Sequence, residues 1–184
     1  MNRYYVERNC GHDIVRDRLN DDKPLTAYEI VKLLNNEKIS PKIGRELHVY
    51  TDGSCNVSER IGGWAIVSKE FTASGRKQDT TNNEMELYAI LKAIEHGQAG
   101  NYSKVHIYTD SEYALKTLTE WAYKWESKGW KKKGGVIRNL ELIKEIFSVV
   151  KDNDRFVFHK VKAHDGVKYN EQADKLAKSC CDKG

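Results

Sequence analysis

Two stretches of the sequence are nearly identical, and each ends in an aspartate. They read His48-Val-Tyr-Thr-Asp52 and His106-Ile-Tyr-Thr-Asp110. Their alternation of apolar and polar residues predicts two strands, and ligand sites in open α/β sheets gather at the carboxyl ends of strands. If the two strands are neighbours, their aspartates meet at one edge of the sheet. A simpler interpretation is that Thr-Asp begins a turn or caps the next helix, which suits Asp110-Ser111.

Two neighbouring aspartates would repel each other, so a cation is expected between them. Oxygen ligands suit Mg²⁺ or Mn²⁺, and the spacing of cysteines and histidines shows no set suited to zinc. Further carboxylates should point to the same place, and the candidates are Glu84 or Glu86 and Asp174. Glu84 and Glu86 lie two positions apart on a predicted helix and point in nearly opposite directions, so one of them faces the site. The residues alone leave that choice open.

Strands and helices alternate in the predicted structure from about residue 46 onward. Strands rich in β-branched and aromatic residues are expected at 47–52, 63–68, about 70–75, 104–110 and 155–161. Helices are expected at about 83–97, from 111, at 139–150 and at 170–180. This order predicts an α/β fold with a five-stranded mixed sheet flanked by helices.

The first 45 residues show a different pattern. Short strands at 4–6 and 13–15 precede a helix that begins at Thr26, where Glu29 completes a capping box. Pro41 and Gly44 then interrupt the pattern. The sequence therefore predicts a small strand–strand–helix module at 1–37, a linker at 38–45 and the main domain at 46–184.

Composition limits the class of protein. The 184 residues include 31 Lys+Arg and 27 Asp+Glu, a net charge of +4 that permits a polyanionic partner without requiring one. No apolar run approaches the roughly 20 residues that span a bilayer, and the first residues lack the apolar stretch of a signal peptide. Four cysteines without a C-x-x-C pair are expected to be reduced thiols. We expect a cytoplasmic protein without a membrane partner.

Four motifs of the main domain together resemble ribonuclease H of type 1. The motifs occur in the family's order, on the predicted strand, helix, strand and helix, from about residue 47 to the C-terminus. The family's fold is a five-stranded mixed sheet with flanking helices, and its activity is metal-dependent cutting of the RNA strand of RNA–DNA hybrids. The motifs are Thr51-Asp52-Gly53-Ser54, Thr81-Asn82-Asn83-Glu84-Met85-Glu86-Leu87, Tyr108-Thr109-Asp110-Ser111, and Val161-Lys162-Ala163-His164 followed by Asn170-Glu171-Gln172-Ala173-Asp174.

The resemblance implies a catalytic site. It favours Glu86 over Glu84, and it implies that two Mg²⁺ ions, with Mn²⁺ as a substitute, act without a small-molecule cofactor. His164 matches the family's mobile histidine, which helps to move protons or release product. The four metal-binding carboxylates would be Asp52, Glu86, Asp110 and Asp174.

The resemblance also implies contacts with the RNA–DNA hybrid. Small polar side chains suit the shallow minor groove, and a basic protrusion at 121–135 interleaves tryptophans with lysines that neutralise phosphates. Trp121 and Trp125 are expected mainly to pack, whereas the later part of the protrusion is expected to touch the substrate. The candidate contacts are Ser54, Ser58, Thr81, Asn82, Asn83, Trp130, Lys131, Lys132 and Lys133.

Two alternatives to a ribonuclease H remain on this evidence. One is a different nuclease or strand-transfer enzyme of the same fold, and the other is a protein that binds hybrids without cutting them. The module at 1–37 is expected to bind hybrids, to dock or to aid folding. The chain is expected to act as a monomer.

Overall fold

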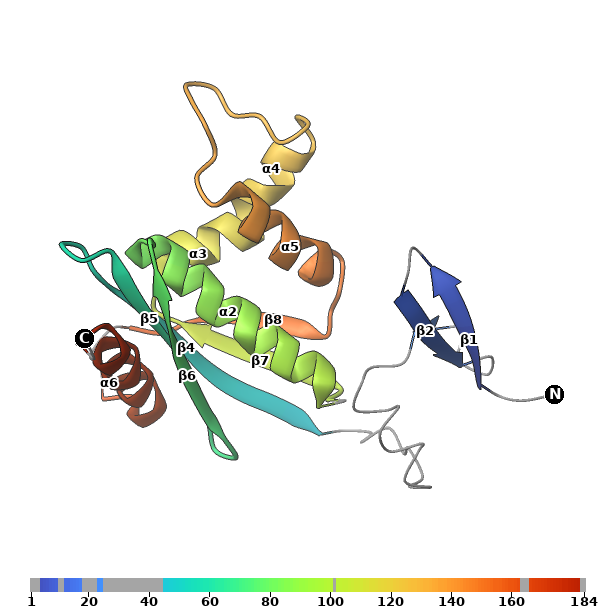
Figure 1. The fold of residues 1–184 in the computed structure, drawn as a ribbon, viewed down its shortest axis with the longest axis horizontal. Coiled ribbons are helices and arrows are strands. Elements are labelled where there is room, and N and C mark those ends of the chain that lie inside the picture. The colour runs from blue at the N-terminus through green and yellow to red at the C-terminus, as the bar shows by residue number, and fades with distance from the viewer. Residues whose placement is uncertain are drawn as a thin grey trace.

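The computed structural model describes residues 4–9, 12–17, 23–24, 45–100, 102–162 and 166–182. Five strands form one mixed sheet in the order β6-β5-β4-β7-β8 (Figure 1). β4 pairs with β5 in antiparallel and with β7 in parallel orientation, β5–β6 is antiparallel, and β7–β8 is parallel. The predicted five-stranded mixed sheet is thus confirmed. The strands are β4 (Glu46–Asn56), β5 (Ile61–Ser68), β6 (Thr72–Gln78), β7 (Lys104–Thr109) and β8 (Phe156–Lys160).

The helices lie close to their predicted positions. The segment predicted as one helix from residue 111 consists of α3, a π-helical turn η1 and α4 in direct succession. The last helix begins two residues earlier than predicted. The helices are α2 (Asn82–Ala99), α3 (Glu112–Lys116), η1 (Thr117–Trp121), α4 (Ala122–Glu126), α5 (Leu140–Val150) and α6 (Lys168–Asp182).

Local hydrogen bonds explain where strand boundaries differ from prediction. The Ser68 hydroxyl accepts the backbone N–H groups of Glu70 and Phe71, and this turn delays β6 until Thr72. The predicted strand at 70–75 therefore lies at Thr72–Gln78. β4 runs four residues beyond Asp52, because its end pairs with β5 in a hairpin.

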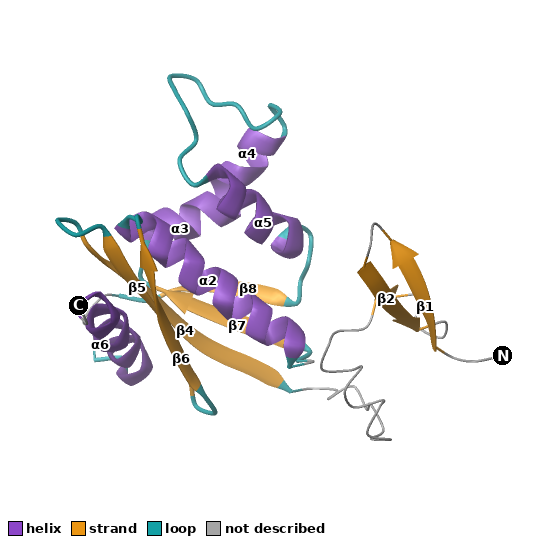
Figure 2. Cartoon of the chain, in the orientation of Figure 1, coloured by secondary structure: helices purple, strands orange, loops and turns teal. Residues whose placement is uncertain are grey.

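Each face of the sheet packs against helices, with α2 on one side and α6 on the other (Figures 1 and 2). The larger core joins alternate residues of the strands, such as Leu47 and Val49, to the apolar face of α2. A smaller core of alanines and one valine lies between β5 and α6. Because alternate side chains of a strand point to opposite faces, both faces of β4 and β5 are partly buried. The segment between α4 and α5 projects away from this body (Figure 2).

The N-terminal part contains a separate three-stranded sheet. β1 (Tyr4–Asn9) and β2 (His12–Asp17) are antiparallel, as their predicted positions suggested, and β3 (Lys23–Pro24) pairs with β2. The third strand was not predicted. The helix expected from Thr26 lies outside the described residues, so the division into 1–37, 38–45 and 46–184 stays a prediction.

Membrane-spanning helices were sought in the described part of the chain, and no helix there is both long enough and apolar enough to cross a bilayer.

Candidate active site

The two similar stretches are neighbouring parallel strands in register. Thr51 pairs with Thr109, so Asp52 and Asp110 follow at the same end of β4 and β7. This confirms the prediction that the two aspartates meet. The alternative role of helix cap falls to Ser111, whose hydroxyl accepts the N–H of Ala114.

The structure separates the two glutamates of α2. Glu84 forms an ion pair with Lys77 and accepts a hydrogen bond from the Thr80 hydroxyl at 3.1 Å. Glu86 lies on the opposite side of the helix, where its carboxylate joins those of Asp52 and Asp110. One ligand oxygen from each of these three residues lies within 4.8 Å of the other two.

Gly53 permits this approach of α2 to β4. A Cβ atom at position 53 would lie 2.2 Å from the backbone nitrogen of Glu86 and 2.3 Å from the carbonyl carbon of Met85. Both distances are shorter than real Cβ contacts, and the backbone of a helix cannot move aside cheaply. The backbone N–H of Gly53 also donates to the Glu86 carboxylate. The glycine after Asp52 therefore sets the position of Glu86.

Asp174 approaches from α6 and contributes to the field at the cluster. Its carboxylate accepts from Lys178 one turn later, with Nζ to Oδ1 at 2.7 Å. The buried Asn170 donates from Nδ2 to Oδ2 of Asp110 at 3.2 Å and thereby orients that carboxylate. Lys160, at the end of β8, donates to the backbone carbonyl of Asp110.

Burial and mutual repulsion make these carboxyl groups hard to ionise. Burial, with the negative charges of Asp110 and Asp174, raises the pKa of Asp52 to about 8, although Lys178 opposes the shift. Burial also raises the pKa of Glu86 well above its ordinary value, and Asp52 adds to the effect. A divalent cation would reverse both terms, because it replaces lost solvation and screens the carboxylates from each other.

The donor set fits a hard divalent cation. All the ligand atoms are carboxylate oxygens, which suit Mg²⁺ or Mn²⁺. The Oε2 atom of Glu86 is buried and has no hydrogen-bond partner among the described residues. A buried carboxylate oxygen without a partner is costly, and a bound cation would satisfy it. His164 lies outside the described residues, so its predicted role is untested.

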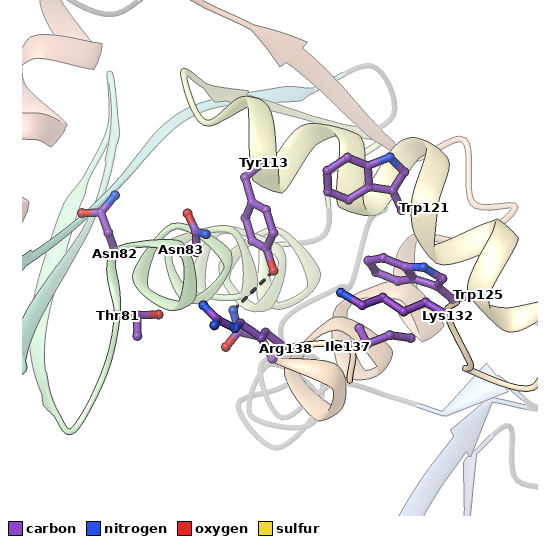
Figure 3. A pocket seen from close by; sticks show the side chains of 10 residues that line it. Thr81, Asn82, Asn83, Tyr113, Trp121, Trp125, Lys132, Ile137 and Arg138 are labelled. Carbon is purple, nitrogen blue, oxygen red and sulfur yellow. Dashed lines mark hydrogen bonds between the residues drawn. The ribbon is translucent and has the colours of Figure 1, made fainter. Parts of the chain in front are cut away.

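A pocket of about 580 Å³ opens beside the carboxylates (Figure 3). Thr81, Asn82 and Asn83 at the start of α2 form one wall, and Trp121 and Trp125 lie across from them. Asn83 precedes Glu86 by three residues, so the two lie on the same side of α2, one turn apart. The pocket therefore adjoins the acidic cluster.

The remaining sides of the pocket are basic and aromatic. Lys132 of the protrusion extends beneath the Trp125 ring, and Arg138 lies at the start of α5 (Figure 3). Tyr113 points inward and accepts a hydrogen bond from Asn139 at 3.4 Å. Positive charge beside aromatic rings suits a nucleic-acid strand, whose phosphates and sugars need both.

The structure distributes the predicted substrate contacts over several places. Thr81 caps α2, because its hydroxyl accepts the N–H of Glu84 at 3.3 Å, and it also lines the pocket. Ser58 lies in the exposed β4–β5 turn and donates its hydroxyl to Asn56 at 2.7 Å, whereas Ser54 lies within β4 next to Gly53. The lysines at 131–133 are exposed.

The tryptophans of the protrusion differ from expectation. Trp130 packs edge-on against Phe147 with ring centroids 5.8 Å apart, and Lys144 lies over its ring. Trp125 packs against the core but also lines the pocket together with Trp121. The expectation that Trp121 and Trp125 mainly pack therefore gives only part of their surroundings.

Sequence reasoning assigned no role to Asn170, Lys178, Tyr113 or Arg138. For Asn170 a signal existed, since it precedes Asp174 by four residues and so lies one helical turn away. The others reach the site only through the packing of α3, α5 and α6, and no local pattern marks them.

Comparison with known proteins places this geometry in a family. The family model for RNase H matches residues 44–182. Ribonuclease H of Wolbachia sp. subsp. Drosophila simulans (strain wRi) is 39% identical over 141 residues, 73% of this chain and 94% of the relative. Ribonuclease H of Ruthia magnifica subsp. Calyptogena magnifica is 36% identical over 140 residues, with coverage of 73% and 94%.

A solved structure agrees with these sequence matches. The crystal structure of LC9-RNase H1, titled a type 1 RNase H with the type 2 active-site motif, has a TM-score of 0.62 at 30% identity. The match covers 74% of this chain and 72% of that chain. With an acidic cluster at the ends of β4 and β7 and a family match over most of its length, the chain belongs to the ribonuclease H family.

Proposed function

We propose that the chain cuts the RNA strand of RNA–DNA hybrids at the acidic cluster, with Asp52, Glu86, Asp110 and Asp174 as metal ligands. Membership of the ribonuclease H family makes the protein a metal-dependent endoribonuclease acting on such hybrids. The observation that carries the assignment to this cluster is the meeting of three carboxylate oxygens around the buried, unpartnered Oε2 of Glu86.

The chain's own residues position the metal ligands. Asn170 fixes the Asp110 carboxylate through its amide, and the Gly53 backbone N–H holds that of Glu86. Bound divalent ions would supply the activation of a water and stabilise the leaving 3′ oxygen. Lys178 partly neutralises Asp174, which limits the repulsion among the four carboxylates.

The pocket is proposed as the site where the hybrid lies. Asn82 and Asn83 are exposed amides one turn from the acidic cluster, and such groups can bond to base edges and 2′-hydroxyls in a shallow groove. Trp121 and Trp125 would stack on sugars or bases of the strand opposite. Lys132 and its lysine neighbours would neutralise phosphates, which gives affinity without sequence specificity.

We also propose Mg²⁺ as the physiological ion, with Mn²⁺ as a substitute, because the donor set is all oxygen. A monomer is proposed, since one chain supplies all four carboxylates. The described cysteines Cys55, Cys180 and Cys181 are free, which suits a reducing compartment such as the cytoplasm.

Cleavage assays test the proposal directly. Matched RNA–DNA hybrid, double-stranded RNA, double-stranded DNA and single-stranded RNA are each incubated with Mg²⁺, Mn²⁺ or EDTA. We expect cutting of the hybrid alone, and only with metal. The matched pair of variants is Glu86→Gln, which should abolish cutting, and Glu84→Gln, which should retain it because Glu84 pairs with Lys77. Hybrid binding without cutting under any metal would refute the enzyme assignment.

A further inference from the structure

A second group of metal-binding side chains lies on the sheet, away from the acidic cluster. Glu46 and His48 belong to β4, and His106 belongs to β7, where it is the register partner of His48. Glu46 and His48 alternate with the buried Leu47 and Val49, so they point to the face of the sheet opposite α2. Two histidines and one glutamate from adjacent strands therefore share one surface.

The ligand atoms of these residues converge. The Oε2 atom of Glu46 lies 3.1 Å from Nε2 of His106 and 4.0 Å from Nε2 of His48. One ligand atom from each residue lies within 4.8 Å of the other two. Ligands bound tetrahedrally at about 2.0–2.1 Å from one ion are about 3.3 Å apart. The His48 side chain is 53% exposed, so its ring is free to turn by the small amount required.

Neighbouring groups hold both imidazoles by the other ring nitrogen. Nδ1 of His48 lies 3.0 Å from the Tyr108 hydroxyl, and Nδ1 of His106 lies 2.9 Å from Nε2 of His159. When each Nδ1 carries the proton, both Nε2 lone pairs face the Glu46 carboxylate. This matches metal-ligating histidines in general, which donate their second ring N–H to a supporting group.

We propose that Glu46, His48 and His106 form a second cation site, which takes a borderline transition-metal ion such as Zn²⁺ with water completing its coordination. Two imidazoles and one carboxylate suit Zn²⁺ far better than Mg²⁺, which prefers oxygen ligands alone. The site is separate from the catalytic cluster, since Glu46 and Asp52 are six residues apart on one strand, about 20 Å. A bound ion would join β4 to β7 and stabilise the sheet.

Zinc titration of the full-length chain in excess Mg²⁺ tests this site. Mg²⁺ occupies the carboxylate cluster, so the histidine site is read separately by calorimetry and by the ring ¹H–¹⁵N signals of the histidines. We expect Zn²⁺ to shift the Nε2 signals of His48 and His106 and to raise the melting temperature. Loss of one binding event is expected in the double variant His48→Ala/His106→Ala. Tyr108→Phe, which removes the group that holds His48, should weaken Zn²⁺ binding by about 10-fold.

His96→Gln is the matched control. His96 lies on α2, stacked on Phe71, and its loss should leave Zn²⁺ binding unchanged. Cleavage of hybrid with Mg²⁺ should also persist in the double variant, which separates this proposal from that of the catalytic site. Equal zinc stoichiometry and affinity in the wild type and the double variant would overturn the proposal. Unshifted Nε2 signals of His48 and His106 in the wild type would do so without any variant.

Discussion

Replacement of Asp52 by asparagine should stabilise the metal-free protein. The pKa of Asp52 is raised from 3.8 to about 8, so the folded state holds a proton that the unfolded state releases. Stability therefore falls as pH rises from about 4 and stops falling above about 8. Because each pH unit in this window is worth about 1.4 kcal/mol per proton, an ionised Asp52 costs the fold up to roughly 4 kcal/mol at pH 7. Asp52→Asn removes that cost.

Urea unfolding followed by circular dichroism, in EDTA at pH 5 and pH 7, measures this difference. The gain of Asp52→Asn over the wild type should be larger at pH 7. Glu84→Gln is the control, since Glu84 is paired with Lys77 and its loss should give no stabilisation. Excess Mg²⁺ should stabilise the wild type, by about 2.7 kcal/mol at 100 times the dissociation constant, and the Asp52 variant much less. Equal stability of Asp52→Asn and the wild type in EDTA at pH 7 would refute the electrostatic reasoning.

Three further perturbations follow from the geometry. Gly53→Ala should destabilise the fold by roughly 3 kcal/mol and abolish cutting, because the added Cβ collides with the α2 backbone at Glu86; an unchanged melting temperature would contradict this. Asn170→Ala should weaken Mg²⁺ activation about 10-fold through loss of its hydrogen bond to Asp110, as a Mg²⁺ dependence of cleavage would reveal. Alanines at the three lysines 131–133 should weaken hybrid binding and reduce its log–log salt slope by about 2, and an unchanged slope would place the phosphate contacts elsewhere.

The sheet and the paired aspartates were predictable because their signals are local. A strand with alternating burial needs only its own residues, and the repeat ending at Asp52 and Asp110 marks two strand ends of one kind. The helix starting near Asn82 was predictable from its cap at Thr81 and its apolar spacing. Strand limits were less accurate, since hydroxyl-bonded turns such as that at Ser68 depend on the exact path of the chain.

The choice of Glu86 shows where local patterns end. Two glutamates two residues apart are equivalent until the rotation of α2 about its axis is fixed, and that rotation depends on close contact with Gly53 of β4. Only the resemblance to ribonuclease H favoured Glu86 in advance. The packed structure supplies the physical reason, since Glu84 turns to Lys77 and Glu86 to the aspartates.

The sequence by itself determined the fold class, the two aspartates at neighbouring strand ends and the chemistry of an oxygen-ligand metal site, because residue types and short-range periodicity carry that information. Tertiary structure alone decided which distant side chains meet. Cysteine and histidine spacing showed no zinc set, yet strand pairing brings His48 and His106 together beside Glu46. Helix packing likewise brings Trp121 and Trp125 to the pocket wall. Such contacts join residues far apart in the chain, and their positions depend on how whole elements pack.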